Sequence, residues 1–172
     1  MEKIKVLDDF VDDATCDNMV KTYDRLFQGR NKNYDGRLLL SNPHDPEVNA
    51  FLKVYVGKLS SLFNQLYYIR DLLLSIYQVG ARVDPHVDFE VKHLKDSMGV
   101  LFYFNDDFKG GDLYFTNFEF NYQPKKGSIV IFPCNDPEYK HGVNPVTEGI
   151  RYTLPLELTT NKAWTKYDLE VI

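Results

Sequence analysis

The sequence predicts an α+β fold, mainly β: a double-stranded β-helix (jelly roll) with N-terminal helices packed on its major sheet. Amphipathic helical patterns are confined to residues 1–66, whereas residues 67–160 carry short apolar segments separated by turn signals. Helices followed by many short strands are typical of a β-sandwich or barrel braced by helices. Aromatic residues, which favour strands, make up 15% of the chain.

A single domain is expected for the 172 residues, because this length suits one hydrophobic core. Residues 1–66 would form a helical buttress and residues 67–160 the jelly-roll core. No internal repeat, low-complexity tract or Pro/Gly/Ser-rich linker divides the chain.

The N-terminal part opens with a short strand over residues 4–10, and Asp12 or Asp13 can cap the helix that follows. Gly29 is expected to end that helix. Its apolar residues recur at helical spacing and should pack against a sheet: Met19, Val20, Tyr23, Leu26 and Phe27.

Residues 30–45, rich in Asn, Gly and Pro, are expected to form a loop. A second helix should begin near Pro46, a residue that suits the first helical turn. Its apolar stripe extends from Val48 to Leu66.

The remaining chain predicts short strands with turns between them. The expected strands cover residues 68–79, 86–90, 98–105, 112–116, 118–122, 128–132 and 150–158.

Composition excludes few functions, but it disfavours some. The formal charge is −5 and the calculated pI is 5.3, whereas nucleic-acid binders usually carry a basic face. The N-terminus lacks the apolar core of a secretory signal, and apolar runs are too short to span a membrane. Cys16 and Cys134 are expected to be buried thiols in a reducing compartment. These features predict a cytoplasmic protein, with a monomer plausible.

The stretch Asp84-Pro85-His86-Val87-Asp88 carries the strongest chemical signal. Residues i and i+2 of a strand point to the same face, so His86 and Asp88 would project together. His141, which follows an apolar strand, is the natural source of a second imidazole. Two histidines and one carboxylate on one face of an iron ion leave positions open for a co-substrate and O2.

Arg151 lies ten residues beyond His141, within an otherwise apolar strand. Arg151 and Thr153 would share one face of this strand. A guanidinium in apolar surroundings needs an anionic partner, and it can grip a carboxylate with two parallel hydrogen bonds. A dicarboxylate that chelates iron at one end would place its other carboxylate there.

Each of these residues has a simpler interpretation when taken alone. His-x-Asp is common by chance, a lone histidine is often a loop residue, and an arginine in a strand often pairs with a core carboxylate. The order and spacing of the whole set favour a metal site. His44 and His93 lie in polar turn or loop segments and are interpreted as structural or solvated.

Taken together, these motifs resemble the iron- and 2-oxoglutarate-dependent dioxygenases, and among them the prolyl 4-hydroxylase-like group. The resemblance covers most of the chain, and the ordered set is more specific than any one piece. The matching segments are VLDDFVDDATCDNMV, IYQVGARVDPHVD, VLFYFNDDFKGGDLYF, PKKGSIVIFP and HGVNPVTEGIRYTLP.

The resemblance implies an oxidoreductase that uses Fe(II), 2-oxoglutarate and O2. His86, Asp88 and His141 would be the catalytic metal ligands. Arg151 would bind the distal carboxylate of 2-oxoglutarate, with Thr153 as a helper. Tyr77 and Tyr103 lie where family members often place tyrosines that contact the co-substrate, although core packing explains each tyrosine equally well. Gly110 and Gly111 are interpreted as turn formers.

The substrate implied by the resemblance is a prolyl residue of a peptide or protein, and residues 30–41 could form a lid or a plain surface connection. A free amino acid or another small metabolite remains an alternative. Oxidative demethylation of nucleobases, as in the AlkB-like group, is disfavoured because Glu157 stands where that group has a second arginine.

Two further alternatives belong to other classes of protein. A jelly roll can be a non-catalytic binding module with a vestigial metal site, but the complete triad with Arg151 argues against this. A cupin-like metal isomerase usually has more histidines than the four present here and lacks the arrangement at Arg151.

Overall fold

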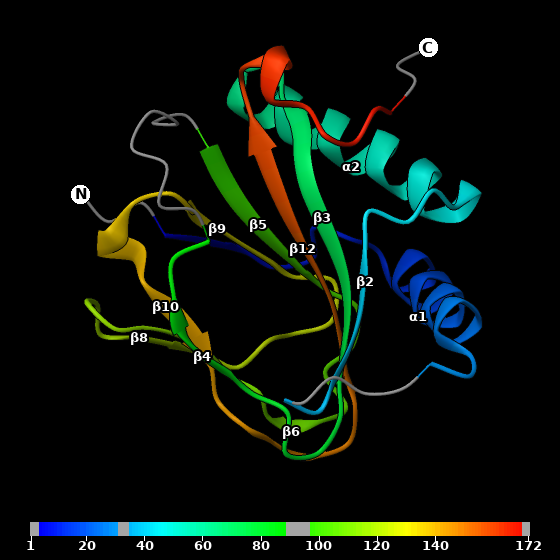
Figure 1. The fold of residues 1–172 in the computed structure, drawn as a ribbon, viewed down its shortest axis with the longest axis vertical. Helices are drawn as coiled ribbons and strands as arrows, with labels where there is room; N and C mark the ends of the chain where they lie inside the picture. The colour runs from blue at the N-terminus through cyan, green and yellow to red at the C-terminus, as the bar shows by residue number, and fades with distance from the viewer. Residues whose placement is uncertain (1–3, 31–34, 89–96, 170–172) are drawn as a thin grey trace.

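Two β-sheets face each other, and two helices cover the outer face of the larger sheet (Figure 1). The computed structural model describes residues 4–30, 35–88 and 97–169. This arrangement confirms the predicted α+β jelly roll with helices on the major sheet.

The major sheet has six strands in the order β1-β9-β5-β12-β3-β2, and all neighbours are antiparallel. Its strands are β1 (Lys5–Leu7), β2 (Arg37–Ser41), β3 (Tyr68–Tyr77), β5 (Ser97–Tyr103), β9 (Ile129–Pro133) and β12 (Arg151–Thr159).

The minor sheet has the order β4-β10-β7-β8, and a two-stranded β11-β6 ladder closes one end of the fold. These strands are β4 (Val83–His86), β6 (Lys109–Gly110), β7 (Leu113–Phe115), β8 (Phe120–Tyr122), β10 (His141–Val143) and β11 (Val146–Glu148). Short 3-10 helices cover Pro137–Tyr139 and Lys162–Trp164.

Side chains of the central strands alternate between the two faces of the major sheet, so that one set packs under the helices and the other faces the space between the sheets. On β12, Leu154, Leu156 and Leu158 point outwards and pack under the helices. Arg151 and Thr153 point inwards, between the sheets, and line a cavity there. The inward face of the major sheet therefore carries the polar residues that matter for function.

Helix α1 (Asp13–Phe27) begins after Asp12, whose side chain accepts a hydrogen bond from the Thr15 N–H at 2.9 Å. Gly29 follows the helix at φ 73°, as expected of a residue that ends a helix. Helix α2 (Pro46–Phe63) has Pro46 in its first turn, as predicted. The apolar faces of both helices join the same outer core.

Asp45 connects the two helices, because it caps α2 and also accepts a hydrogen bond from Arg25 of α1 at 2.9 Å. We expect Asp45→Ala to lower the free energy of unfolding by about 2 kcal/mol. Asp45→Asn keeps a capping oxygen and should cost only about 0.5 kcal/mol, since the Arg25 side chain is 50% exposed and its ion pair is screened. Urea unfolding of both variants checks this ranking.

The same variants test a pH dependence. Burial opposes ionisation of Asp45, but hydrogen bonds from Arg25 and from the Val48 and Glu47 N–H groups outweigh it and lower its pKa below 3.8. Its stabilising contribution should therefore be complete above the unfolded-state pKa and lost as the pH falls through the lower folded value. Equal acid sensitivity of wild type and Asp45→Asn would contradict this.

The structure corrects three boundaries. Residues 37–41, predicted as loop, form β2, which pairs with β3 at the sheet edge. Strand β4 covers Val83–His86, not 86–90, and residues 89 and 90 lie outside the described part of the chain. Helix α2 ends at Phe63, because Asn64 adopts the left-handed conformation at φ 48°, so Leu66 is not helical.

Cys16 and Cys134 are both free and buried, as predicted. Within the described ranges, no helix combines the length and apolar character needed to cross a membrane.

Candidate metal and co-substrate site

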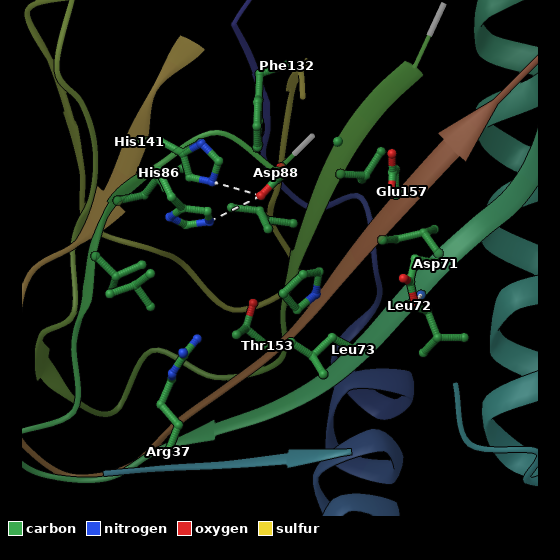
Figure 2. A pocket seen from close by; sticks show the side chains of 18 of the residues that line it. Arg37, Asp71, Leu72, Leu73, His86, Asp88, Phe132, His141, Thr153 and Glu157 are labelled. Carbon is green, nitrogen blue, oxygen red and sulfur yellow. Dashed lines mark hydrogen bonds and ion pairs between the residues drawn. The ribbon is translucent and has the colours of Figure 1, made fainter. Parts of the chain in front are cut away.

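The three predicted metal ligands come together between the sheets (Figure 2). His86 is the last residue of β4, and His141 is the first residue of β10 and lies opposite it in register. Asp88 lies in a bend two residues beyond the end of β4, not on a strand. The prediction that Asp88 lies on the same strand face as His86 was therefore wrong, although the Asp88 carboxylate still points towards both imidazoles.

The geometry of this cluster suits an octahedral metal ion. Asp88 Oδ1 lies 3.2 Å from His86 Nε2 and 3.6 Å from His141 Nε2. Adjacent ligand atoms around an octahedral ion with bonds of about 2.1 Å lie about 3 Å apart. Two imidazoles and one carboxylate match the facial set that Fe(II) takes in non-haem oxygenases.

Both imidazoles are oriented by backbone carbonyl oxygens. His86 Nδ1 lies 3.0 Å from the carbonyl oxygen of Asp84, and His141 Nδ1 lies 3.1 Å from that of Tyr139. A carbonyl can only accept, so each Nδ1 carries the proton and each Nε2 keeps its lone pair for a metal. Sequence reasoning could not identify these carbonyl partners.

The two histidines differ in their surroundings. The hydrogen bond that the protonated His86 ring donates to the Asp88 carboxylate raises the pKa of His86, although burial opposes it. Burial lowers the pKa of His141. The centre of its ring lies 4.6 Å from the centre of the Phe132 ring and 5.4 Å from that of the Phe115 ring. A neutral imidazole is the form that binds a metal ion, so His141 is suited to this role at neutral pH.

Gly142 allows β10 to fit between β4 and β7. A Cβ atom there would lie 2.6 Å from the Tyr114 hydroxyl oxygen and 2.8 Å from the Val83 carbonyl oxygen. We expect Gly142→Ala to destabilise the protein by about 2 kcal/mol, which is a fall in melting temperature of roughly 5 °C, and to weaken metal binding at His141. Calorimetry with and without metal measures both effects.

The matched control is Gly57→Ala in the interior of α2, where an added Cβ meets nothing within 4 Å. This change should stabilise the protein slightly, because alanine restricts the unfolded chain and favours a helix. A Gly142→Ala variant as stable as Gly57→Ala would show that the Gly142 contact is not tight.

Arg151 lines the same cavity as this cluster and is 1% exposed. Its guanidinium is 4.3 Å from the centre of the Tyr77 ring and 5.2 Å from that of Tyr103. Its Nε and Nη1 atoms and the Tyr103 hydroxyl are buried without a hydrogen-bond partner among the described residues. Buried donors of this kind are rarely left unpaired, so they fit an anion bound between them.

Thr153 also lines the cavity, and its hydroxyl donates a hydrogen bond to the Phe102 carbonyl at 2.8 Å. Its oxygen keeps lone pairs for a further donor. Gly111 has φ 68°, and an added Cβ would lie 3.1 Å from Arg151 Cδ, so this position also leaves room for the arginine. Gly110 has φ 69° and approaches the Pro145 carbonyl, which agrees with its interpretation as a turn former.

A cavity of about 310 Å³ is lined by the three candidate ligands and by Tyr77, Arg151 and Thr153. It extends along the inward face of the major sheet from Arg37 to Asp71 and Glu157 (Figure 2). Arg151 lies at the Arg37 end, because both arginines pair with Tyr77 in the sheet register. Sequence reasoning did not assign Asp71 to the cavity and used Glu157 only to disfavour nucleobase repair. His44, interpreted as structural, stacks on Tyr167 away from the cavity with ring centres 4.8 Å apart.

Two of the sequence interpretations concern residues that the structure does not describe. His93 lies outside the described residues, as does the 31–34 part of the suggested lid. Arg37, expected in that loop, lies on β2 and forms an ion pair with Asp35.

A family model of the 2OG-Fe(II) oxygenase superfamily matches residues 72–156, which include the three candidate ligands and Arg151. Prolyl 3-hydroxylase 3 of Mus musculus is 39% identical over 82 residues. This alignment covers 42% of the chain but 11% of the mouse protein, so the chain corresponds to a small part of that relative.

Solved structures show the same fold. A Pseudomonas putida prolyl-4-hydroxylase superposes with a TM-score of 0.76 at 16% identity, covering 94% of each chain. The viral collagen prolyl hydroxylase of Paramecium Bursaria Chlorella virus-1, solved as a 2OG complex, gives a TM-score of 0.73 at 18% identity and covers 94% of this chain and 97% of its own.

The chain is similar to the 2OG-Fe(II) oxygenase superfamily over residues 72–156, and its fold is that of solved prolyl hydroxylases. The family indicated by the sequence motifs is thereby confirmed. This is a family of oxidoreductases that use Fe(II), 2-oxoglutarate and O2, and the described residues offer a ligand set that fits these groups.

Proposed function

We propose that this protein is an Fe(II)- and 2-oxoglutarate-dependent dioxygenase that hydroxylates a prolyl residue in a peptide or protein. His86, Asp88 and His141 would hold the metal, and Arg151 would grip the distal carboxylate of 2-oxoglutarate. The observation that carries this proposal is a buried guanidinium with unpaired donors, in the same cavity as a two-histidine, one-carboxylate cluster.

The chain's own residues would bind and orient the reactants. Nδ1 hydrogen bonds fix both imidazoles, and the aromatic rings of Tyr77 and Tyr103 hold the Arg151 guanidinium in place. Thr153 could add a polar contact to the co-substrate. When bound, Fe(II) supplies the oxidising chemistry, in which 2-oxoglutarate and O2 yield succinate and CO2 while one oxygen atom enters a substrate C–H bond.

The prolyl substrate is supported by the mouse prolyl 3-hydroxylase relative and by the prolyl hydroxylase fold. Incubation with Fe(II), 2-oxoglutarate and a panel of proline-containing peptides tests it. We expect stimulated succinate release and a mass gain of one oxygen atom on a peptide. If free amino acids or other metabolites stimulated succinate release and peptides did not, the protein would instead be a hydroxylase of small molecules.

A further inference from the structure

The end of the cavity opposite Arg151 has a charge pattern of its own, formed by Asp71 on β3 and Glu157 on β12 (Figure 2). These two residues are direct partners in the register of the major sheet. Glu157 lies six residues beyond Arg151 on β12, a rise of about 20 Å along the strand. This end is therefore too distant for a short dicarboxylate held by Arg151 to fill.

Glu157 has a carboxylate oxygen that the described protein leaves unpaired. Its side chain is 8% exposed, and its Oε1 forms a buried ion pair with Arg70. Its Oε2 is buried with no hydrogen-bond partner among the described residues. Burial raises the pKa of Glu157 to about 7 in spite of Arg70, which agrees with a carboxylate short of donors. Buried carboxylate oxygens are normally hydrogen-bonded, so Oε2, unpaired among the described residues, is suited to accept a hydrogen bond from a bound molecule.

The charges at this end do not balance. Among the described residues, the carboxylates of Asp71 and Glu157 lie with one guanidinium, that of Arg70, so these groups are together net negative when both acids are ionised. The Asp71 carboxylate accepts a hydrogen bond from the Leu72 N–H at 3.0 Å and lines the cavity. An anionic co-substrate is repelled here and attracted to Arg151, which gives the cavity opposite polarity at its two ends.

Gly99 lets the Phe132 ring and Cys134 pack closely against β5 beside Glu157. It is the partner of Glu157 on β5, and a Cβ atom there would lie 2.9 Å from the Phe132 ring and 3.0 Å from Cys134 Cβ. The wall between the two ends is apolar, with Leu73, Leu101 and Pro155 lining it. An apolar wall that leads to a carboxylate pair suits an aliphatic stem with a positively charged tip.

We propose that this end, defined by Asp71 and Glu157, binds a cationic group of the substrate, an ammonium or guanidinium on an aliphatic stem. The inference rests on the proposed function and narrows it: the peptide that is hydroxylated would carry a lysine or arginine side chain near its target residue. The cation would donate to Glu157 Oε2 and to Asp71, whereas a neutral amide would leave the negative charge of the pair unbalanced and an acidic side chain would be repelled.

The test measures binding separately from turnover. Protein loaded with Fe(II) and 2-oxoglutarate without O2 is titrated calorimetrically with four peptides that carry either lysine or glutamine beside either proline or alanine. We expect the lysine peptides to bind at least about tenfold more tightly than their glutamine counterparts, with or without proline. Preference for proline over alanine, and succinate release in O2, report on the proposed function alone.

The variants Asp71→Asn and Glu157→Gln should each reduce the lysine preference to less than about threefold. If Glu157→Gln unfolds because Arg70 loses its ionic partner, Asp71→Asn still tests the inference. Glu119→Gln, an exposed acid outside the cavity, should keep the full preference. Equal affinity for lysine and glutamine peptides, no measurable binding of the lysine peptides, or an unchanged preference in Asp71→Asn would overturn the inference.

Discussion

Replacing His141 with alanine is expected to abolish Fe(II) binding at the site and, with it, 2-oxoglutarate turnover. His141 is one of three ligand residues, and its ring is fixed by the Tyr139 carbonyl and by packing against Phe132. Loss of an outer-shell partner alone costs about 10- to 100-fold in metal affinity, so loss of the ligand itself should cost more. Equilibrium dialysis with Fe(II) under anaerobic conditions measures the affinity, and succinate release measures turnover.

His44→Ala is the matched control, because His44 stacks on Tyr167 and does not line the cavity. It should bind Fe(II) as wild type does. If His141→Ala retained wild-type Fe(II) affinity, the metal would have to lie elsewhere, and the assignment of the three ligands would be wrong.

Arg151→Met should separate folding from co-substrate binding. The guanidinium is buried without an anion among the described residues, and a charge in that position costs free energy. The variant without ligands should therefore be at least as stable as wild type. Its KM for 2-oxoglutarate should rise by more than about 100-fold, since two charge-assisted hydrogen bonds to a carboxylate contribute about 3 kcal/mol.

Thermal unfolding shows both effects in one experiment. In wild-type protein with metal, 2-oxoglutarate at 100 times its Kd should add about 2.7 kcal/mol of stability, which raises the melting temperature by roughly 5–10 °C. Arg151→Met should lose this increase, whereas Arg30→Met, on the exposed surface, should keep it. An undiminished increase in Arg151→Met would show that 2-oxoglutarate does not bind at Arg151.

Much of the fold could be predicted because the pattern of buried residues follows the period of each element. The alternation along residues 150–154 predicted that Arg151 and Thr153 share one face of a strand, and both line the cavity between the sheets. Strand β2 was missed because its residues follow a run rich in Asn and Gly, and its pairing with β3 depends on a segment far along the chain. Local signals do not report such long-range pairing.

The candidate site was predicted less completely than the fold. The spacing of His86 and Asp88 predicted that the two side chains lie together, but it did not predict the bend after β4 in which Asp88 lies. The backbone carbonyls that orient the imidazoles belong to no particular residue type, so no sequence pattern reveals them. Glu157 could have been found, because it continues the inward-facing series of Arg151 and Thr153 on β12.

The visible absorption spectrum of the anaerobic protein tests the central claim most directly. With Fe(II) and 2-oxoglutarate both present, we predict a weak metal-to-ligand charge-transfer band that requires both components, is absent in His86→Ala and is weakened in Arg151→Ala. A wild-type protein that binds Fe(II) at this site but gives no band with 2-oxoglutarate would contradict the account, because 2-oxoglutarate would then not chelate the metal.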